Sequence, residues 1–167
     1  MLRIITKMAE LSLPALMPVY EQSNLANASD NWPDLPNGFA LQLAEQEFGQ
    51  YLREVFFKTP GAFCAVWEEE GKYVSALRLE PFRDGMLLEA LETAPAERRK
   101  GYAVKLVRSV LAFMGDMKVY SHVGKRNAAS LAVHKHCGFR VLQDHAAYID
   151  GSVDRRCCTL CYQKSME

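Results

Sequence analysis

Four consecutive residues, Arg98-Arg99-Lys100-Gly101, have the types and the spacing to bind an anion. Three cationic side chains precede a glycine, which leaves the neighbouring backbone amides with little steric cover. If a helix begins at this point, its first N–H groups have no intrahelical acceptor and add partial positive charge. Amides and side chains together would then hold a phosphate. A charge run is also typical of a solvated surface, so its position in the fold decides between these interpretations.

The segments on either side of this basic run predict a strand, a turn and a helix. The apolar residues from Leu87 to Leu91 predict a strand, which ends near Pro95 because proline lacks the N–H that a ladder requires. Downstream apolar residues recur at the spacing of one buried helical face. They are Ala103, Leu106, Val107, Val110, Leu111 and Met114, followed by Gly115 as a helix stop. The basic run therefore lies where oriented amides are available.

The segment Arg98 to Ala103 resembles the acetyl-coenzyme A signature of the GNAT-type N-acetyltransferases, Q/R-x-x-G-x-G/A. A second segment, Asn127 to Phe139, resembles the N-x-x-A-x-x-L-Y-x-x-x-G-F helix of the same family. This chain has Ser130, Val133 and His134 where the family usually has alanine, leucine and tyrosine. The specific part of the resemblance lies between about residues 87 and 139. The order of the expected helices and strands resembles that of the family along nearly the whole chain.

The resemblance implies that acetyl-coenzyme A is the cosubstrate. Main-chain groups of Leu91 and Thr93 would pair with the pantetheine arm, and amides from Arg99 to Val104 would hold the pyrophosphate. Arg99 stands where the family often has glycine. The implied binding residues are Leu91, Thr93, Arg98, Arg99, Lys100, Gly101, Tyr102, Ala103, Val104, Asn127 and Ser130, with Lys105, Lys125, Arg126 and Lys135 as further cations for the outer phosphates.

His134 is a candidate general acid. Asn127, Ser130, Leu131 and His134 share one stripe of the predicted helix and can address one ligand. In the family, a tyrosine at the His134 position is placed to donate a proton to the departing thiolate. In water, the pKa is about 6.5 for imidazole, about 8.5 for a thiol and about 10 for a phenol. Imidazolium is therefore the stronger donor but a minority species near neutrality. The alternative is that His134 only lines the pocket.

Glutamates on the strands nearest the expected thioester are candidate general bases. A lysine-like amine, with a pKa of about 10.4, must lose a proton before it attacks. Glu89 is the first candidate and Glu92 the second, with Glu80 on the neighbouring strand. Strand alternation sends Glu89 and Glu92 to opposite faces unless a bulge intervenes. The alternative for each is an ordinary outward-facing carboxylate.

Composition limits the class of protein and its partners. The chain has 167 residues, of which 49% are hydrophobic and 24% charged, which suits one domain over residues 1–167. Twenty basic and twenty acidic side chains cancel, so we expect no nucleic-acid partner and no acidic membrane partner. Charged residues and prolines interrupt any signal-peptide core near the start, and no apolar run approaches the ~20 residues of a membrane span. We therefore expect a cytoplasmic protein.

The five cysteines predict free thiols rather than a metal centre. Their odd number and unpaired spacing are typical of a reducing compartment. Cys158 and Cys161 form a single CxxC in a predicted strand, where residues i and i+3 point to opposite faces. We expect no metal there. Cys137 is predicted to face the core, although a cysteine nucleophile is not excluded.

The remaining pattern predicts an α/β (α+β) fold. We expect a strand at 2–5, helices at 10–28 and 39–57, strands at 63–68 and 73–80, a strand at 117–123, a helix at 128–137 and a closing hairpin of 139–149 with 155–162. Turn-forming residues at 27–38 predict a loop carrying Trp32, a candidate substrate lid. With the resemblance, this order implies a mixed, mostly antiparallel sheet, helices on both faces and a splayed parallel strand pair at the acetyl-coenzyme A site.

The sequence and the resemblance together predict an N-acetyltransferase in which a primary amine attacks acetyl-coenzyme A directly in a ternary complex. The acceptor is a small-molecule amine or a protein or peptide amine, and no motif identifies it. A catalytically silent acyl-coenzyme A sensor or scaffold is the alternative, because the family tyrosine is missing. An acetyltransferase directed at tRNA or the ribosome is disfavoured by the balanced charge. The sequence is compatible with a homodimer but does not predict one.

Overall fold

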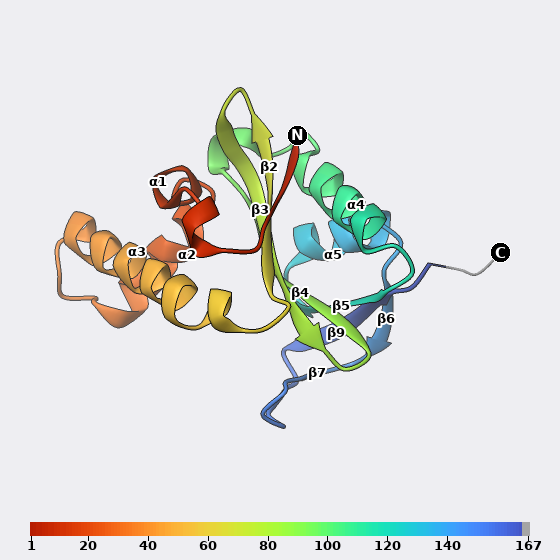
Figure 1. Ribbon diagram of the computed structural model, residues 1–167. Helices are drawn as coiled ribbons and strands as arrows, with labels where there is room; N and C mark the ends of the chain where they lie inside the picture. The colour runs from red at the N-terminus through yellow and green to blue at the C-terminus, as the bar shows by residue number, and fades with distance from the viewer. Residues whose placement is uncertain (165–167) are drawn as a thin grey trace.

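A seven-stranded mixed sheet is the framework of the protein in the computed structural model, which describes residues 1–164 (Figure 1). The strand order is β1-β2-β3-β4-β5-β9-β6. The strands are β1 (Leu2–Ile5), β2 (Phe63–Glu69), β3 (Lys72–Phe82), β4 (Gly85–Thr93), β5 (Lys118–Gly124), β6 (Arg140–Gln143) and β9 (Cys157–Tyr162). All neighbours in this sheet pair antiparallel except β4 and β5, which are parallel. This confirms the predicted mixed sheet and its one parallel pair.

Helices cover both faces of the sheet (Figure 1). One face carries α1 (Leu13–Leu16), α2 (Glu21–Asn31) and α3 (Asn37–Glu54), and the other carries α4 (Tyr102–Met114) and α5 (Ala128–His136). The chain also contains short 3-10 helices, namely η1 (Met8–Glu10), η2 (Phe56–Lys58) and η3 (Pro95–Glu97). In the described part of the chain, no helix combines the length and the apolar content that a bilayer crossing needs.

Two hydrophobic cores attach these layers. Leu106, Val107 and Val110 of α4 are fully buried against the sheet, as the helical spacing predicted. Cys137 belongs to the same core, so its predicted inward position is confirmed. On the opposite face, Leu52 of α3 packs in a second core with residues of β2 and β3. Each fully buried leucine contributes about 1.5–3 kcal/mol relative to an exposed one, so these contacts fix the helices on the sheet.

A bulge interrupts β4 near its middle. Ala76 pairs with Glu92 and Arg78 pairs with Glu89, so two β4 residues, at 90 and 91, lie opposite the single residue between Ala76 and Arg78. Ala90 has a φ of 51°, in the left-handed region that L-residues avoid. On the other edge of β4, pairing with β5 is confined to residues 85–88 opposite 118–121. The two parallel strands therefore separate just where the bulge begins.

The N-terminal helical region differs from the expectation. Instead of one helix over 10–28, α1 ends at Leu16 and α2 begins at Glu21, because Pro18 cannot donate the bond that a continuous helix needs there. The loop expected at 27–38 is shorter, since α2 continues to Asn31. Ala28 is buried against residues of α3, and this packing outweighs the turn-forming composition. Trp32 packs on the same small cluster.

The expected closing hairpin of 139–149 with 155–162 is confirmed in part, because β6 and β9 pair antiparallel, but its first strand is shorter than expected. The strand β9 lies between β5 and β6, so it pairs on both edges. Its partner β6 ends at Gln143, after a register shift that follows Val141. The Thr159 hydroxyl donates to the carbonyl of His145 at 2.7 Å, in place of a continued ladder. Two short strands, β7 (Ala146–Ala147) and β8 (Val153–Asp154), form a separate pair.

Replacing Gly85 with alanine tests how closely β4 must approach β5. A Cβ at this position would overlap the Lys118 carbonyl oxygen and lie 2.9 Å from its carbonyl carbon. We expect Gly85→Ala to lower the free energy of unfolding by about 1–3 kcal/mol, measured by urea denaturation. The control is Gly38→Ala in α3, where nothing lies within 4 Å. It should be neutral or stabilising by up to about 1 kcal/mol, and equal losses in both variants would contradict the close approach.

Candidate active site

A cleft with a volume of about 940 Å³ opens where β4 and β5 separate. Its walls come from the ends of the two strands, the first turn of α4, the α5 helix and the exposed side of α2. Ten of the predicted cofactor residues line it: Leu91, Thr93, Arg98, Arg99, Gly101, Tyr102, Ala103, Val104, Asn127 and Ser130. The cleft is large enough for an extended ligand, since ligand sites commonly measure about 300–1,000 Å³.

The turn before α4 has the geometry of an anion site. Arg99 and Gly101 both adopt positive φ, at 63° and 82°, and α4 begins at Tyr102. Among the described residues, no protein group accepts a hydrogen bond from the backbone N–H groups of residues 99–104. Successive free amides at a helix N-terminus form a concave site for phosphate oxygens. Arg99 adopts this conformation without being glycine, at a cost of about 1–2 kcal/mol.

The basic side chains of the turn have separate roles. Arg98 Nε donates to the Thr93 carbonyl at 3.2 Å, and its guanidinium also donates to Gln22 Oε1 on α2. The Arg98 side chain therefore connects β4, the turn and α2. Lys100 Nζ lies 2.7 Å from Glu97 Oε2, and Lys100 is not among the residues that line the cleft. Lys100 could therefore contribute to anion binding through its backbone amide but not through its side chain.

The α5 helix brings a buried histidine to the cleft. The Asn127 side chain caps the helix by accepting from the Ser130 amide at 3.1 Å. His134 is 1% exposed, and its Nδ1 donates to the Ser130 carbonyl at 2.8 Å, which leaves Nε2 with no hydrogen-bond partner among the described residues. Burial lowers the pKa of His134, and the bond to Ser130 offsets this only in part. The ring is therefore neutral at pH 7, with a bare lone pair on Nε2.

Hydrogen bonds from two other segments hold the bulge of β4 in place. The buried hydroxyl of Tyr20 donates to the Ala90 carbonyl at 2.8 Å. Ser75 Oγ donates to the Glu92 carbonyl at 2.7 Å. Because the bulge adds one residue, Glu89 and Glu92 lie on the same face of β4, opposite Arg78 and Ala76 respectively. The bulge therefore replaces the simple alternation that would have separated the two glutamates.

Glu89 is paired with an arginine. Its Oε1 accepts a hydrogen bond from Arg78 Nε at 3.2 Å, and both side chains are largely buried. Burial, with a smaller contribution from the Glu89 charge, raises the pKa of Glu80 on β3. One oxygen of the Glu89 carboxylate is therefore held by Arg78 and directed toward its guanidinium.

Glu92 lies in a different electrostatic environment. Burial raises the pKa of Glu92 to about 7, against the opposing effects of Arg98, of the bond from the Ser23 hydroxyl and of Arg78. A carboxyl group with a pKa near the ambient pH is suited to both accepting and releasing a proton. Glu92 is therefore the better prepared of the two predicted bases.

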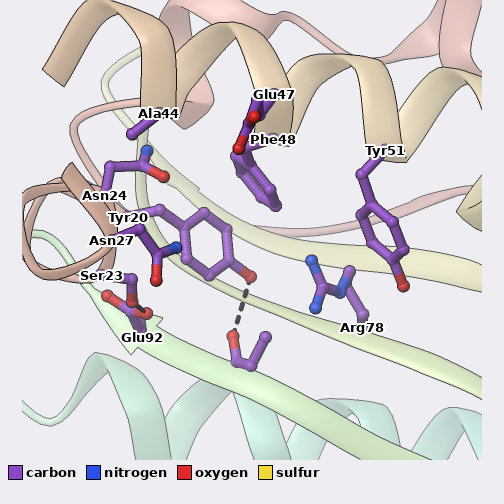
Figure 2. Close-up of a pocket in the computed structure, with 11 residues that line it drawn as sticks. Tyr20, Ser23, Asn24, Asn27, Ala44, Glu47, Phe48, Tyr51, Arg78 and Glu92 are labelled. Atoms are coloured by element: carbon purple, nitrogen blue, oxygen red, sulfur yellow. Dashed lines mark hydrogen bonds between the residues drawn. The ribbon is translucent and has the colours of Figure 1, made fainter. Parts of the chain in front are cut away.

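A second, smaller pocket adjoins the cleft. It has a volume of about 330 Å³ and lies between α2, α3, β3 and β4 (Figure 2). Ser23, Ala90 and Glu92 line both cavities, so the bulge and the Glu92 carboxyl form the shared wall. Its other walls are Tyr20, Asn24, Asn27, Ala44, Glu47, Phe48, Tyr51 and Arg78. Two ligands bound in the two cavities would meet at Glu92.

Sequence reasoning missed most of the residues in the smaller pocket. Tyr20 lies between two short helices that no motif marks. Only Arg78 could have been noticed from the sequence, because it is the one cation in the mostly apolar run from Tyr73 to Leu79 of β3. A lone charge on the inward side of a strand requires a partner, which the structure supplies as Glu89.

His122, which had no predicted role, also lines the cleft. Its ring packs edge-on against the rings of Phe82 and Tyr148, with distances between ring centroids of 5.4 Å and 4.9 Å. Neither ring nitrogen has a hydrogen-bond partner among the described residues. Burial, together with the positive charge of Arg83, lowers the pKa of His122, which keeps the ring neutral.

Comparisons with known proteins agree with this architecture. The acetyltransferase (GNAT) family matches residues 25–139 of the chain. No curated protein sequence gives a significant match. Among solved structures, a PaiA N-acetyltransferase from Thermoplasma acidophilum in complex with coenzyme A has 12% identity and a TM-score of 0.68, covering 98% of this chain and 99% of that one.

Two further structures share the fold at low identity. A ribosomal-protein-alanine N-acetyltransferase from Brucella melitensis has 19% identity and a TM-score of 0.60, with 98% of this chain and 99% of that one covered. A mutant spermidine N-acetyltransferase from Vibrio cholerae has 17% identity and a TM-score of 0.61, with 98% and 92% covered. At these identities the likeness concerns the fold.

Proposed function

This chain belongs to the GNAT acetyltransferase family, and on that premise we propose that it transfers an acetyl group from acetyl-coenzyme A to a primary amine. The observation that carries the proposal is the shared wall at Glu92. A long cleft ending in an amide-lined turn adjoins a small pocket, and a carboxyl group with a pKa of about 7 lies between them. This arrangement suits a ternary complex in which the amine attacks the thioester directly.

The cleft residues fit coenzyme A. The free amides of residues 99–104 would hold the diphosphate, and Arg98 and Arg99 add positive charge beside them. The edge of β4 beyond Leu88 no longer pairs with β5, so its main-chain groups at Leu91 are available to an amide-rich arm. The related structure from Thermoplasma acidophilum contains coenzyme A, which supports the same use of this cleft. Acetyl-coenzyme A supplies the activated acetyl group.

Glu92 acts as the general base in this proposal. The ammonium form of the acceptor has no lone pair, so a group at the shared wall must take a proton before attack. Glu92 can do so in its ionised form, whereas Glu89 is engaged by Arg78. We therefore place Glu92 ahead of Glu89, reversing the order that the sequence favoured.

His134 acts as the general acid through Nε2. The bond to the Ser130 carbonyl engages Nδ1, so the proton donor would be Nε2, which is buried and has no hydrogen-bond partner among the described residues. The acidic form is the imidazolium, and its lowered pKa makes it a stronger proton donor but a scarcer one at neutral pH. This scarcity favours the second candidate, an acyl-coenzyme A-binding sensor of the same fold that does not turn over.

Thiol release from acetyl-coenzyme A in the presence of a broad amine panel separates the two functions. An enzyme releases coenzyme A only when a suitable amine is present, whereas a sensor binds without amine-dependent release. With an accepted amine, we expect Glu92→Gln to reduce kcat about 10²- to 10⁴-fold. In the wild type, kcat/KM should rise with pH through about 7, because the raised pKa of Glu92 keeps the base protonated below that point.

The matched control for this variant is Glu47→Gln. Glu47 lines the same pocket but is exposed on α3 and does not line the cleft. We expect it to leave the rise in kcat/KM near pH 7 in place. Unchanged kcat in Glu92→Gln, with the same pH profile as the wild type, would remove Glu92 from the mechanism.

A pair of substitutions at His134 tests the acid. We expect His134→Gln, which keeps a polar group without a titrating proton, to lower kcat about 10- to 100-fold, at the weak end of general acid effects. His134→Tyr should restore most of the loss, because a phenol can donate to a thiolate. Turnover is measured at saturating amine, and thermal unfolding checks that the buried site tolerates each change. Equal turnover of the wild type and His134→Gln would exclude the acid role.

A further inference from the structure

We propose that the smaller pocket selects amines that also carry a carboxylate, and that Arg78 binds that carboxylate. The inference rests on the proposed function, because it names the class of acceptor for the same site. It concerns a residue that the chemistry of acetyl transfer does not require. The hydrogen bonds, packing and neighbouring charges of Arg78 support it.

Arg78 uses only part of its hydrogen-bonding capacity within the protein. A guanidinium has five N–H donors, and Arg78 spends one of them, Nε–H, on Glu89 Oε1. No group in residues 1–164 accepts a hydrogen bond from its two terminal nitrogens. The side chain is only 14% exposed, and Figure 2 shows the guanidinium directed into the pocket, toward Tyr20. The four N–H donors of the terminal nitrogens are therefore without a protein acceptor among the described residues.

Aromatic rings fix the guanidinium in place. Its central carbon lies 5.6 Å from the Phe48 ring centroid, 5.2 Å from that of Tyr51 and 5.6 Å from that of Phe56. Such packing restrains a long side chain before any ligand binds, so less conformational entropy is lost on binding. A planar, preorganised pair of terminal nitrogens matches the two oxygens of a carboxylate.

Charged groups at two positions in the pocket, Glu92 and Arg78, would orient a ligand that carries both an amine and a carboxylate. Glu92 lies at the cleft end, where an ammonium group would be attracted before it is deprotonated. A cationic group placed directly against the Arg78 guanidinium would be repelled, whereas a carboxylate there can accept its hydrogen bonds. The other lining carboxylate, Glu47, is exposed and available to solvent. An amine directed at Glu92 and a carboxylate that accepts from the terminal nitrogens of Arg78 would occupy opposite ends of the pocket, and a volume of about 330 Å³ suits a molecule the size of an amino acid.

Matched pairs of amines test the inference. Each pair contains an amino acid and its carboxamide: glycine and glycinamide, phenylalanine and phenylalaninamide, 4-aminobutyrate and 4-aminobutanamide. We expect the wild type to prefer the carboxylate member of at least one pair by about 10- to 100-fold in kcat/KM, since hydrogen bonds to a charged group have this worth. In Arg78→Lys, which keeps the charge near Glu89 but loses the planar pair of donors, the preference should fall severalfold, mainly through KM.

The matched control is Arg83→Lys. Arg83 also stacks on two rings, those of Phe82 and Tyr120 at 5.0 Å and 5.5 Å, but it does not line the pocket. It should retain the wild-type preference. Thermal unfolding of both variants verifies that they are folded. Equal kcat/KM for the two members of every pair in a wild type that acetylates them would overturn the inference and leave the proposed function standing.

A binding experiment separates the two proposals. Calorimetry with 3-phenylpropionate and 3-phenylpropionamide, which lack an amine, reports on the pocket without turnover. We expect the carboxylate to bind more tightly than the amide in the wild type, and this difference to shrink in Arg78→Lys. That result together with no acetylation of any amine would support carboxylate recognition and refute the proposed function. No difference between the two ligands would count against Arg78 as the carboxylate site.

Discussion

The bulge at Ala90 is the constraint on which the site depends. It holds a non-glycine residue at positive φ, which costs about 1–2 kcal/mol. The hydroxyl of Tyr20 and the side chain of Ser75 bond to carbonyls of the bulged segment, and each such bond contributes about 0.5–1.5 kcal/mol. The strain is thus offset locally by buried partners from an N-terminal turn and from β3.

Two consequences follow from this single extra residue. The β4 strand leaves β5 beyond Leu88, which opens the large cleft and frees the edge of the strand. Glu92 also turns to the face that α2 and α3 cover, where burial raises its pKa to about 7. Without the bulge, Glu92 would face the α4 side, and the shared wall between the cavities would lack its titrating group.

The sequence predicted the elements with the strongest local signals. The α4 stripe, the basic turn and the parallel pairing of β4 with β5 follow from spacing, glycine and the connection between the strands. The bulge did not follow, because nothing in the order Glu89-Ala90-Leu91 distinguishes a bulged strand from a regular one. The small pocket depends on contacts between distant segments, such as Tyr20 with Ala90 and Arg78 with Glu89, and local patterns do not encode them. The divided C-terminal segment was missed for the same reason.

We propose above all that the amides of residues 99–104 hold a diphosphate in the cleft beside the bulge. It is tested most directly by following backbone amide resonances in NMR spectra while coenzyme A is added. We expect saturable shifts at residues 99–104 and along β4 beyond Leu88, whereas adenosine, which lacks the diphosphate, should leave the turn unchanged. Saturable shifts confined to other surfaces, or a turn that does not respond to coenzyme A, would contradict it.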